Sequence, residues 1–142
     1  MVIWKEAQGT EMVCRVMRMG PDSKAQFHWH ENLEFCQPLN KDCTFLVNGR
    51  LYRAEPGDII AIDRQVVHRF MPEEPDVHIR VLQFPMRILL HSGACSGILR
   101  IHIPRKELSL SQGFGKVYAR LWNSWRRNPG FAPGRKILCC KA

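Results

Sequence analysis

Short apolar runs separated by turn residues fill the chain from about residue 11 to residue 84. The runs include CTFLV, LYRAE, IIAI and VHIRVLQF, and they are rich in Val, Ile, Leu and Phe. Runs of this length and composition predict β-strands. Many short strands at close spacing are typical of an antiparallel sandwich or barrel, so we expect an all-β fold.

The turn residues between the runs support this prediction. Asn48-Gly49 separates CTFLV from LYRAE. Both central positions of a type I′ turn need positive φ, which Asn and Gly tolerate, so we expect a tight hairpin at this point. Further turns are predicted at Pro56-Gly57-Asp58 and at residues 72–76.

The pattern changes period after Pro104, where apolar residues recur at helical spacing and predict an amphipathic C-terminal α-helix. We therefore divide the chain into a barrel over residues 1–104 and a basic helical appendage over residues 105–142. The apolar face of the helix packs either on the barrel or on a second copy of the chain, which would make a homodimer. The residues of this face are Leu110, Phe114, Val117, Tyr118, Leu121, Trp122 and Trp125.

Length and composition favour one folded unit. With 142 residues the chain is long enough to bury one core. No run approaches the roughly 18 apolar residues of a membrane span, and the charged N-terminal residues do not fit a signal peptide. We therefore expect a cytoplasmic protein with no membrane partner. The six cysteines have no paired spacing and no CxxC pair, which favours reduced thiols over disulfides or a zinc ribbon.

Positive charge is concentrated in the C-terminal third of the chain. Residues 1–99 contain eleven Lys or Arg and twelve Asp or Glu, whereas residues 100–142 contain ten Lys or Arg and one acidic residue, Glu107. A solvated basic helix face explains this better than direct contact with DNA, because a single helix of this kind is not a helix-turn-helix and would read no base sequence.

The segments FHWHENLE and VVHRF contain the residues that best indicate chemistry. His28, His30 and Glu34 are all even-numbered, so they point the same way if their strand runs without a bulge. With His68 from a neighbouring strand they would form a set of three imidazoles and one carboxylate, suited to a divalent metal such as Fe, Mn, Ni or Zn. The same side chains would also suit hydrogen bonds to a polar small molecule in a barrel pocket, and both interpretations stay open.

These segments resemble the cupin superfamily. HWHENLEF matches its first motif, of the form HxHxxxE; FLVNGRLYRAEPGDIIAI matches the hairpin and turn that follow, and VVHRF supplies the later histidine. The chain looks most like the N-terminal cupin sensor domain of AraC-type transcription regulators, over about residues 10 to 135. The resemblance implies a cupin-type antiparallel β-barrel (a double-stranded β-helix, or jelly roll) with a C-terminal α-helix. It also implies that ligand or metal contacts His28, His30, Glu34 and His68.

The resemblance implies a small-molecule-sensing and dimerisation domain whose effector is a sugar or another polar metabolite. Such a domain regulates without chemistry, so no catalytic residue is predicted. The helix-turn-helix modules that follow in AraC-type proteins are not in this sequence, so we expect a truncated product or excised fragment that contacts DNA only through a missing C-terminal domain. The alternative is a stand-alone metal-dependent cupin enzyme, such as a dioxygenase or isomerase, although such a barrel would not need the basic tail.

Overall fold

The structure is a computed structural model that describes residues 2–6, 13–23, 26–85 and 101–107. These residues form ten β-strands and one 3-10 helix. In chain order the elements are β1 (Trp4–Lys5), β2 (Val13–Met19), β3 (His28–Trp29), β4 (Leu33–Pro38), β5 (Cys43–Val47), β6 (Arg50–Ala54), β7 (Ile59–Ile62), β8 (His68–Met71), β9 (Val77–Phe84), β10 (His102–Ile103) and η1 (Arg105–Glu107).

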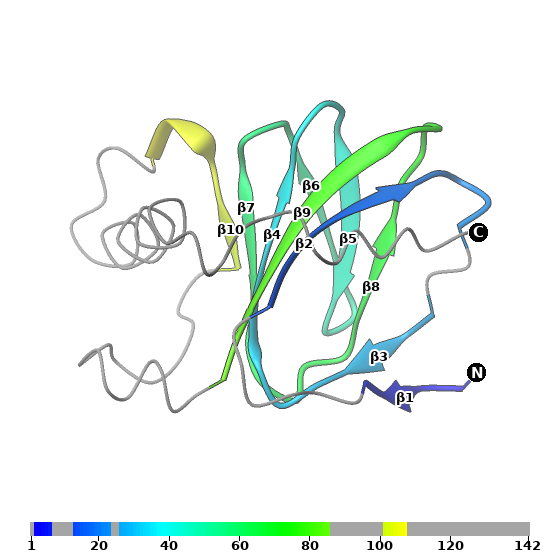
Figure 1. The fold of residues 1–142 in the computed structure, drawn as a ribbon, viewed down its shortest axis with the longest axis vertical. Coiled ribbons are helices and arrows are strands. Elements are labelled where there is room, and N and C mark those ends of the chain that lie inside the picture. Colours follow the sequence, from blue (N-terminus) through cyan, green and yellow to red (C-terminus); the bar gives the residue numbers. More distant parts are fainter. Residues whose placement is uncertain (1, 7–12, 24–25, 86–100, 108–142) are drawn as a thin grey trace.

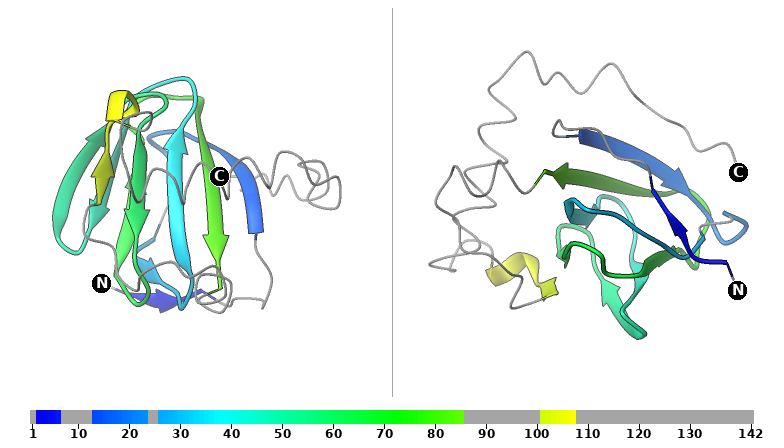
Figure 2. Two further views of the ribbon diagram at one scale, coloured as in Figure 1. Left: turned by 90° about the vertical axis from the view of Figure 1, so that its left-hand side faces the viewer. Right: turned by 90° about the horizontal axis from the view of Figure 1, so that it is seen from below.

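The strands form two five-stranded sheets (Figures 1 and 2). One sheet has the order β1-β3-β8-β5-β6 and the other the order β10-β7-β4-β9-β2. Neighbouring strands pair antiparallel, except that β1 runs parallel to β3. The chain passes repeatedly from one sheet to the other, as in the double-sheet jelly roll. The predicted all-β fold of the cupin type is therefore confirmed.

Inward side chains of the two sheets form one hydrophobic core. In β5 the side chains of Phe45 and Val47 are buried and the residue between them is partly exposed, as period-two alternation requires. From the other sheet, Ile79 and Val81 of β9 join the same cluster of buried side chains. Since each such side chain contributes about 1.5–3 kcal/mol on burial, this contact holds the sheets face to face.

The hairpin between β5 and β6 has the predicted geometry. Asn48 and Gly49 both adopt positive φ, of 49° and 76°, and Val47 pairs with Arg50 across the turn. A β-branched or bulky residue at either central position would be strained, which is why the Asn-Gly pair predicts the turn so well.

Only the first residues of the predicted C-terminal appendage are described. They form η1, shortly after β10, which belongs to the predicted barrel and pairs with β7 at one edge of its sheet. The predicted amphipathic helix falls within residues 108–142, outside the described residues. In the described ranges no helix is both long and apolar enough to cross a membrane.

Asp58 joins this C-terminal segment to the turn before β7. Its Oδ2 accepts hydrogen bonds from the Glu55 main-chain N–H and from His102 Nε2, each at 3.0 Å, and its Oδ1 accepts one from the Arg105 main-chain N–H at 2.7 Å. Burial favours a higher pKa for Asp58, but these hydrogen bonds outweigh it and hold that pKa below its ordinary value.

We expect Asp58→Ala to lower the free energy of unfolding by about 1–3 kcal/mol near neutral pH, because three donors lose their acceptor. The folded pKa of Asp58 lies below its unfolded value, so its carboxylate stabilises the fold above about pH 4 and this contribution disappears as the pH falls through the folded pKa. Urea unfolding of both proteins across this range should show the difference between them shrinking toward low pH.

The matched control is Asp22→Ala, in an exposed turn, which should change the free energy of unfolding by less than about 0.5 kcal/mol. Equal losses in the two variants would show that Asp58 does not hold the segment.

Candidate functional site

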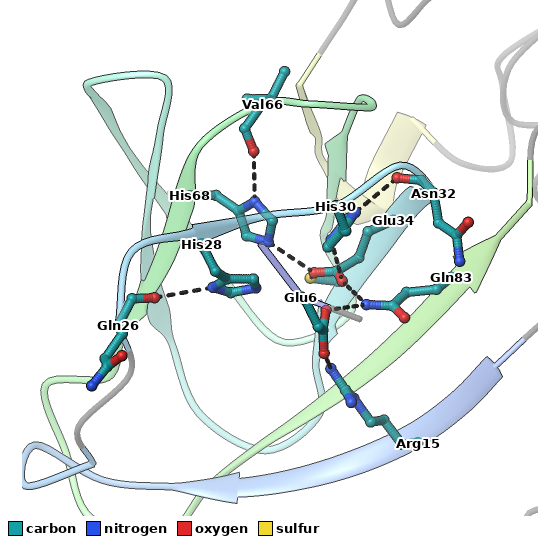
Figure 3. Close-up of polar contacts among 11 residues, drawn as sticks. Glu6, Arg15, Gln26, His28, His30, Asn32, Glu34, Val66, His68 and Gln83 are labelled. Atoms are coloured by element: carbon teal, nitrogen blue, oxygen red, sulfur yellow. Dashed lines mark hydrogen bonds and ion pairs between the residues drawn. The ribbon is translucent and has the colours of Figure 1, made fainter. Parts of the chain in front are cut away.

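The four residues that the sequence singles out lie together between the two sheets (Figure 3). The ring centroid of His68 is 4.1 Å from that of His28 and 4.9 Å from that of His30. Glu34 Oε2 is 3.0 Å from His30 Nε2, and Glu34 Oε1 is 3.6 Å from His68 Nε2. His30, Glu34 and His68 are fully buried, and His28 is partly exposed. We call His28, His30, Glu34 and His68 the His–Glu cluster.

Strand register explains how two of these histidines meet. His28 in β3 lies directly opposite His68 in β8. Side chains of directly opposed residues leave the same face of a sheet and stand about 5 Å apart at Cβ. In the other sheet, Glu34 of β4 lies opposite Gln83 of β9, so this polar pair also faces the interior.

The segment from His28 to Glu34 is not one continuous strand, as the even-numbered spacing had assumed. β3 ends at Trp29, β4 begins at Leu33, and the chain passes from one sheet to the other between them. His30 lies in this crossing, and its main-chain carbonyl accepts a hydrogen bond of 2.8 Å from the Gln65 N–H, in the loop before β8. The cluster therefore forms between two facing sheets and not along one face of one strand.

Main-chain carbonyls orient all three imidazoles. In each ring, Nδ1 lies 2.9 or 3.0 Å from a carbonyl oxygen two residues away along the chain. Because a carbonyl only accepts, each Nδ1 carries a proton, so in a neutral ring Nε2 is the nitrogen that can bind a ligand. Metal-binding imidazoles are held in the same way. The ring and carbonyl pairs are His28 with Gln26, His30 with Asn32, and His68 with Val66.

Glu34 is the centre of the hydrogen bonding in the cluster. Its Oε2 accepts hydrogen bonds from Gln83 Nε2 at 2.6 Å and from protonated His30 Nε2 at 3.0 Å. Burial would raise the pKa of Glu34, but His30 and His68 beside it hold that pKa well below its ordinary value. Burial would likewise lower the pKa of His30, but the hydrogen bond and charge of Glu34 outweigh it and raise that pKa. Both shifts favour an imidazolium–carboxylate pair.

His28 and His68 differ from His30. Burial, together with the neighbouring His68, lowers the pKa of His28 and so favours its neutral ring. Nε2 of His68 is buried and has no hydrogen-bond partner among the described residues. Leaving a buried polar atom without a partner costs about 1–3 kcal/mol, so this nitrogen is a natural point of contact for a ligand.

Four further residues complete the site and were not predicted. Gln83 Nε2 also donates to Glu6 Oε2 at 3.2 Å, and an Arg15 guanidinium N–H donates to Glu6 Oε1 at 3.3 Å (Figure 3). Cys36 Sγ donates to Glu34 Oε1 at 3.0 Å. Burial and the Glu34 charge raise the pKa of the Cys36 thiol well above its ordinary value, so it stays protonated.

The sequence held a signal for two of these four residues. Gln83 continues the series of buried odd-numbered positions 77, 79 and 81, so a polar residue occupies the core face of β9. In the same way, Arg15 lies two residues before Met17, on the face of β2 that carries the buried Met17 and Met19. Glu6 gave no such signal, because it follows a strand of only two residues.

Strand β1 covers one side of the cluster. The Trp4 ring stacks on His28, with centroids 5.5 Å apart and planes 26° apart. The Lys5 ammonium lies 4.9 Å from the centroid of the Trp29 ring and 3.3 Å from Glu31 Oε1. These contacts bring Glu6, the next residue, to the interior of the site.

The imidazoles of the cluster fit a divalent cation. One ligand atom from each of His28, His30 and His68 lies within 4.8 Å of the other two. Metal bonds of about 2.0–2.2 Å place the ligand atoms of one ion no more than about 4.4 Å apart, so small side-chain rotations would bring the three onto one ion. His68 Nε2, which lies 3.6 Å from Glu34 and forms no hydrogen bond among the described residues, agrees with such a ligand. The same atoms can also hydrogen-bond the hydroxyl groups of a polar molecule.

A surface cavity of about 420 Å³ lies elsewhere, near β6, the turn before β7, and β10, and includes no residue of the His–Glu cluster. Its lining carries both signs of charge, with Arg53 and Arg105 near Glu55 and Asp58.

Comparison with protein families gives one match over most of the chain. The model of the family described as "AraC-like ligand binding domain" matches residues 12–133. Comparison with curated proteins found no match.

Similar solved structures include two mutants of Bacillus subtilis oxalate decarboxylase, each 15% identical to this chain, with TM-scores of 0.42 and 0.41. A structure of oxalate decarboxylase from the same organism at pH 4.6 is 17% identical, with a TM-score of 0.37. The matches cover 75% of this chain and 27%, 27% and 26% of those chains, so the chain spans about a quarter of their length.

We expect His30→Ala to lower the free energy of unfolding by about 3–5 kcal/mol, because it leaves the buried Glu34 carboxylate without its imidazolium partner. The control is His78→Ala. His78 pairs with Asp76 at 3.1 Å on the surface, where such a pair contributes less than about 1 kcal/mol. Chemical denaturation measures both losses, and similar values would contradict the buried ion pair.

Proposed function

Because the chain belongs to the AraC-like ligand binding domain family, we propose that it is a sensor that binds a small polar metabolite, such as a sugar, at the His–Glu cluster. The observation that carries this proposal is a cluster of three carbonyl-oriented imidazoles with one buried carboxylate, which lies 3.0 Å from His30 and 3.6 Å from His68. Small-molecule sites contain a few placed polar groups that set orientation and specificity, and the four side chains of the cluster would be such groups.

The polar atoms of the cluster are matched to hydroxyl groups. The neutral His28 Nε2 and the oxygens of Glu34 are acceptors, so the hydroxyl groups of a polyol could donate to them. Trp4, stacked on His28, offers an aromatic face beside these atoms. A flat apolar surface next to hydrogen-bonding groups suits a ring that is apolar on its faces and polar at its rim.

The metabolite would act by shifting a population and not by a reaction. On this proposal it binds more tightly to one of two arrangements of the domain, and its differential affinity sets the balance between them. The readout would pass through residues 105–142 and a homodimer, with DNA contact left to a separate module of an AraC-like regulator. A difference in affinity of about 100-fold corresponds to roughly 2.7 kcal/mol, which is within the usual range of such couplings.

A thermal-shift screen of the metal-stripped protein against sugars, polyols and small hydroxy acids tests the binding. A true ligand at 100 times its Kd should add about 2.7 kcal/mol to the free energy of unfolding. His28→Ala should weaken binding at least about tenfold, since it removes one hydrogen-bonding group and the stacking partner of Trp4. His78→Ala, on the surface, should bind as tightly as the wild type. A ligand that stabilises all three proteins equally binds elsewhere, and a screen without any ligand contradicts the proposal.

A second candidate function, a metal-dependent cupin enzyme, is favoured by the fit of the imidazoles to a divalent cation. His28, His30 and His68 would hold the ion, with Glu34 as the fourth ligand. A bound ion would supply Lewis acidity and open coordination positions for a substrate. The residues of the chain would keep their present tasks, since the carbonyl-bonded Nδ1 atoms orient the rings and Gln83 orients the carboxylate.

Elemental analysis of the purified protein separates the two functions. Stoichiometric metal that is lost in a His28→Ala, His30→Ala double variant, and kept in His78→Ala, would favour the enzyme. We expect instead sub-stoichiometric metal together with stabilisation of the metal-free protein by a metabolite, because the ligand-free His30–Glu34 pair already balances its own charge.

A further inference from the structure

The surface cavity near β6 and β10 is lined in part by a turn whose main chain is fixed by hydrogen bonds. In this turn, which precedes β7, the Asp58 N–H donates to the Glu55 carbonyl at 3.0 Å, and the Gly57 N–H donates to the Pro38 carbonyl at 2.9 Å. Gln37 Nε2 donates to the Gly57 carbonyl at 3.0 Å. Small-molecule sites are largely pre-formed and measure about 300–1,000 Å³. This cavity, of about 420 Å³, has a suitable size.

Arg105 is the cation of this cavity whose position is set by the fold. Its main-chain N–H donates to Asp58 Oδ1 at 2.7 Å. The stem of its side chain lies directly on Gly57, where a Cβ atom would be 2.5 Å from Arg105 Cδ and 3.1 Å from Arg105 Cγ. Gly57 also has a φ of 93°, so both the turn and this close approach require glycine. Because the stem is held in place, the guanidinium loses less conformational entropy on binding a ligand than a freely moving one.

The charges that line the cavity are only partly paired. Asp58 accepts hydrogen bonds from three N–H groups, and Arg53 pairs at 3.1 Å with an aspartate outside the cavity. Within the described ranges, the side chains of Arg105, Lys106 and Glu55 form no ion pair or hydrogen bond. Two positive charges and one negative charge are therefore left for a ligand. Guanidinium and ammonium groups bind carboxylate and phosphate oxygens, so this balance favours an anion.

We propose that this cavity binds a small oxyanion, the phosphate or carboxylate group of a metabolite, through Arg105 and Lys106. The planar guanidinium presents two parallel N–H donors to two oxygens, and the ammonium adds a second positive charge. Glu55 repels the anion and limits its affinity. The bound anion lies between β6 and η1, where residues 105–142 begin. This site is separate from the His–Glu cluster, so it goes beyond the function proposed above.

Isothermal titration of the full chain with inorganic phosphate, and separately with succinate, tests the proposal in about 0.1 M NaCl, where charges more than about 10 Å apart are largely screened. We expect Arg105→Gln to weaken anion binding at least about tenfold, because it removes charge-assisted hydrogen bonds. The main-chain N–H that donates to Asp58 remains in this variant. The anion that binds more tightly shows whether the site prefers phosphate or carboxylate.

Two further variants separate a specific site from a general effect of net charge. Glu55→Gln should strengthen binding about two- to threefold, because it removes a repelling charge. The matched control is Arg50→Gln, which loses the same charge as Arg105→Gln from an exposed position of β6 outside the cavity. This control should change the affinity by less than about twofold.

Hydrogen exchange of the wild type gives a second measurement that does not depend on the folding of a variant. The Arg105 and Asp58 amides donate to acceptors at the edge of the cavity. Phosphate should slow their exchange at least about threefold, because it favours the closed form of this segment. The Asn48 amide, which donates to the Val67 carbonyl at 2.9 Å in another part of the fold, should exchange at an unchanged rate.

The proposal is overturned if the wild type binds neither anion, or if Arg105→Gln and Arg50→Gln weaken binding equally. Equal slowing of the Asn48 and Arg105 amides by phosphate also overturns it. None of these outcomes affects the metabolite screen, because a ligand of the His–Glu cluster is recognised there by its dependence on His28.

Discussion

The ionised carboxylate of Glu34 stands in the interior of a small β-barrel, and the rest of the site is arranged around it. Taking such a group out of water costs several kcal/mol, and the cost is offset only if every lone pair finds a donor. Here the donors are His30 from the crossing between sheets, Gln83 from β9 and Cys36 from β4 itself. Packing of the two sheets and satisfaction of this charge therefore depend on each other.

The crossing at residues 30–32 links this charge to the architecture. It carries the chain from β3 in one sheet to β4 in the other, and the Gln65 N–H holds it to the loop that leads to His68. Polar side chains from both sheets consequently meet beside the short connection between β3 and β4. A barrel with the same strands but a different crossing would separate His28 from Glu34.

Local patterns predicted much of this structure. Short apolar runs between turn residues predicted the strands, and Asn48-Gly49 predicted the hairpin with both φ values positive, because these features depend on neighbouring residues alone. The histidine spacing pointed to the right residues, but through a continuous strand that the structure does not contain. Gln83 was predictable from its place on the core face of β9. Glu6 was not, since its position follows from a parallel pairing of β1 with β3, and nothing in five residues of sequence specifies that partner.

The anchoring of each imidazole to a main-chain carbonyl has a consequence for how such a site can change over time. The acceptors belong to residues 26, 32 and 66, yet they are backbone atoms, so replacing those side chains leaves the ring orientations in place. Substitutions around the cluster can then change which ligand it binds, while the Nδ1 atom of each ring keeps its proton and its carbonyl acceptor. The orientation of the three imidazoles is thus fixed by the backbone conformation, and substitutions around them can change the ligand selectivity.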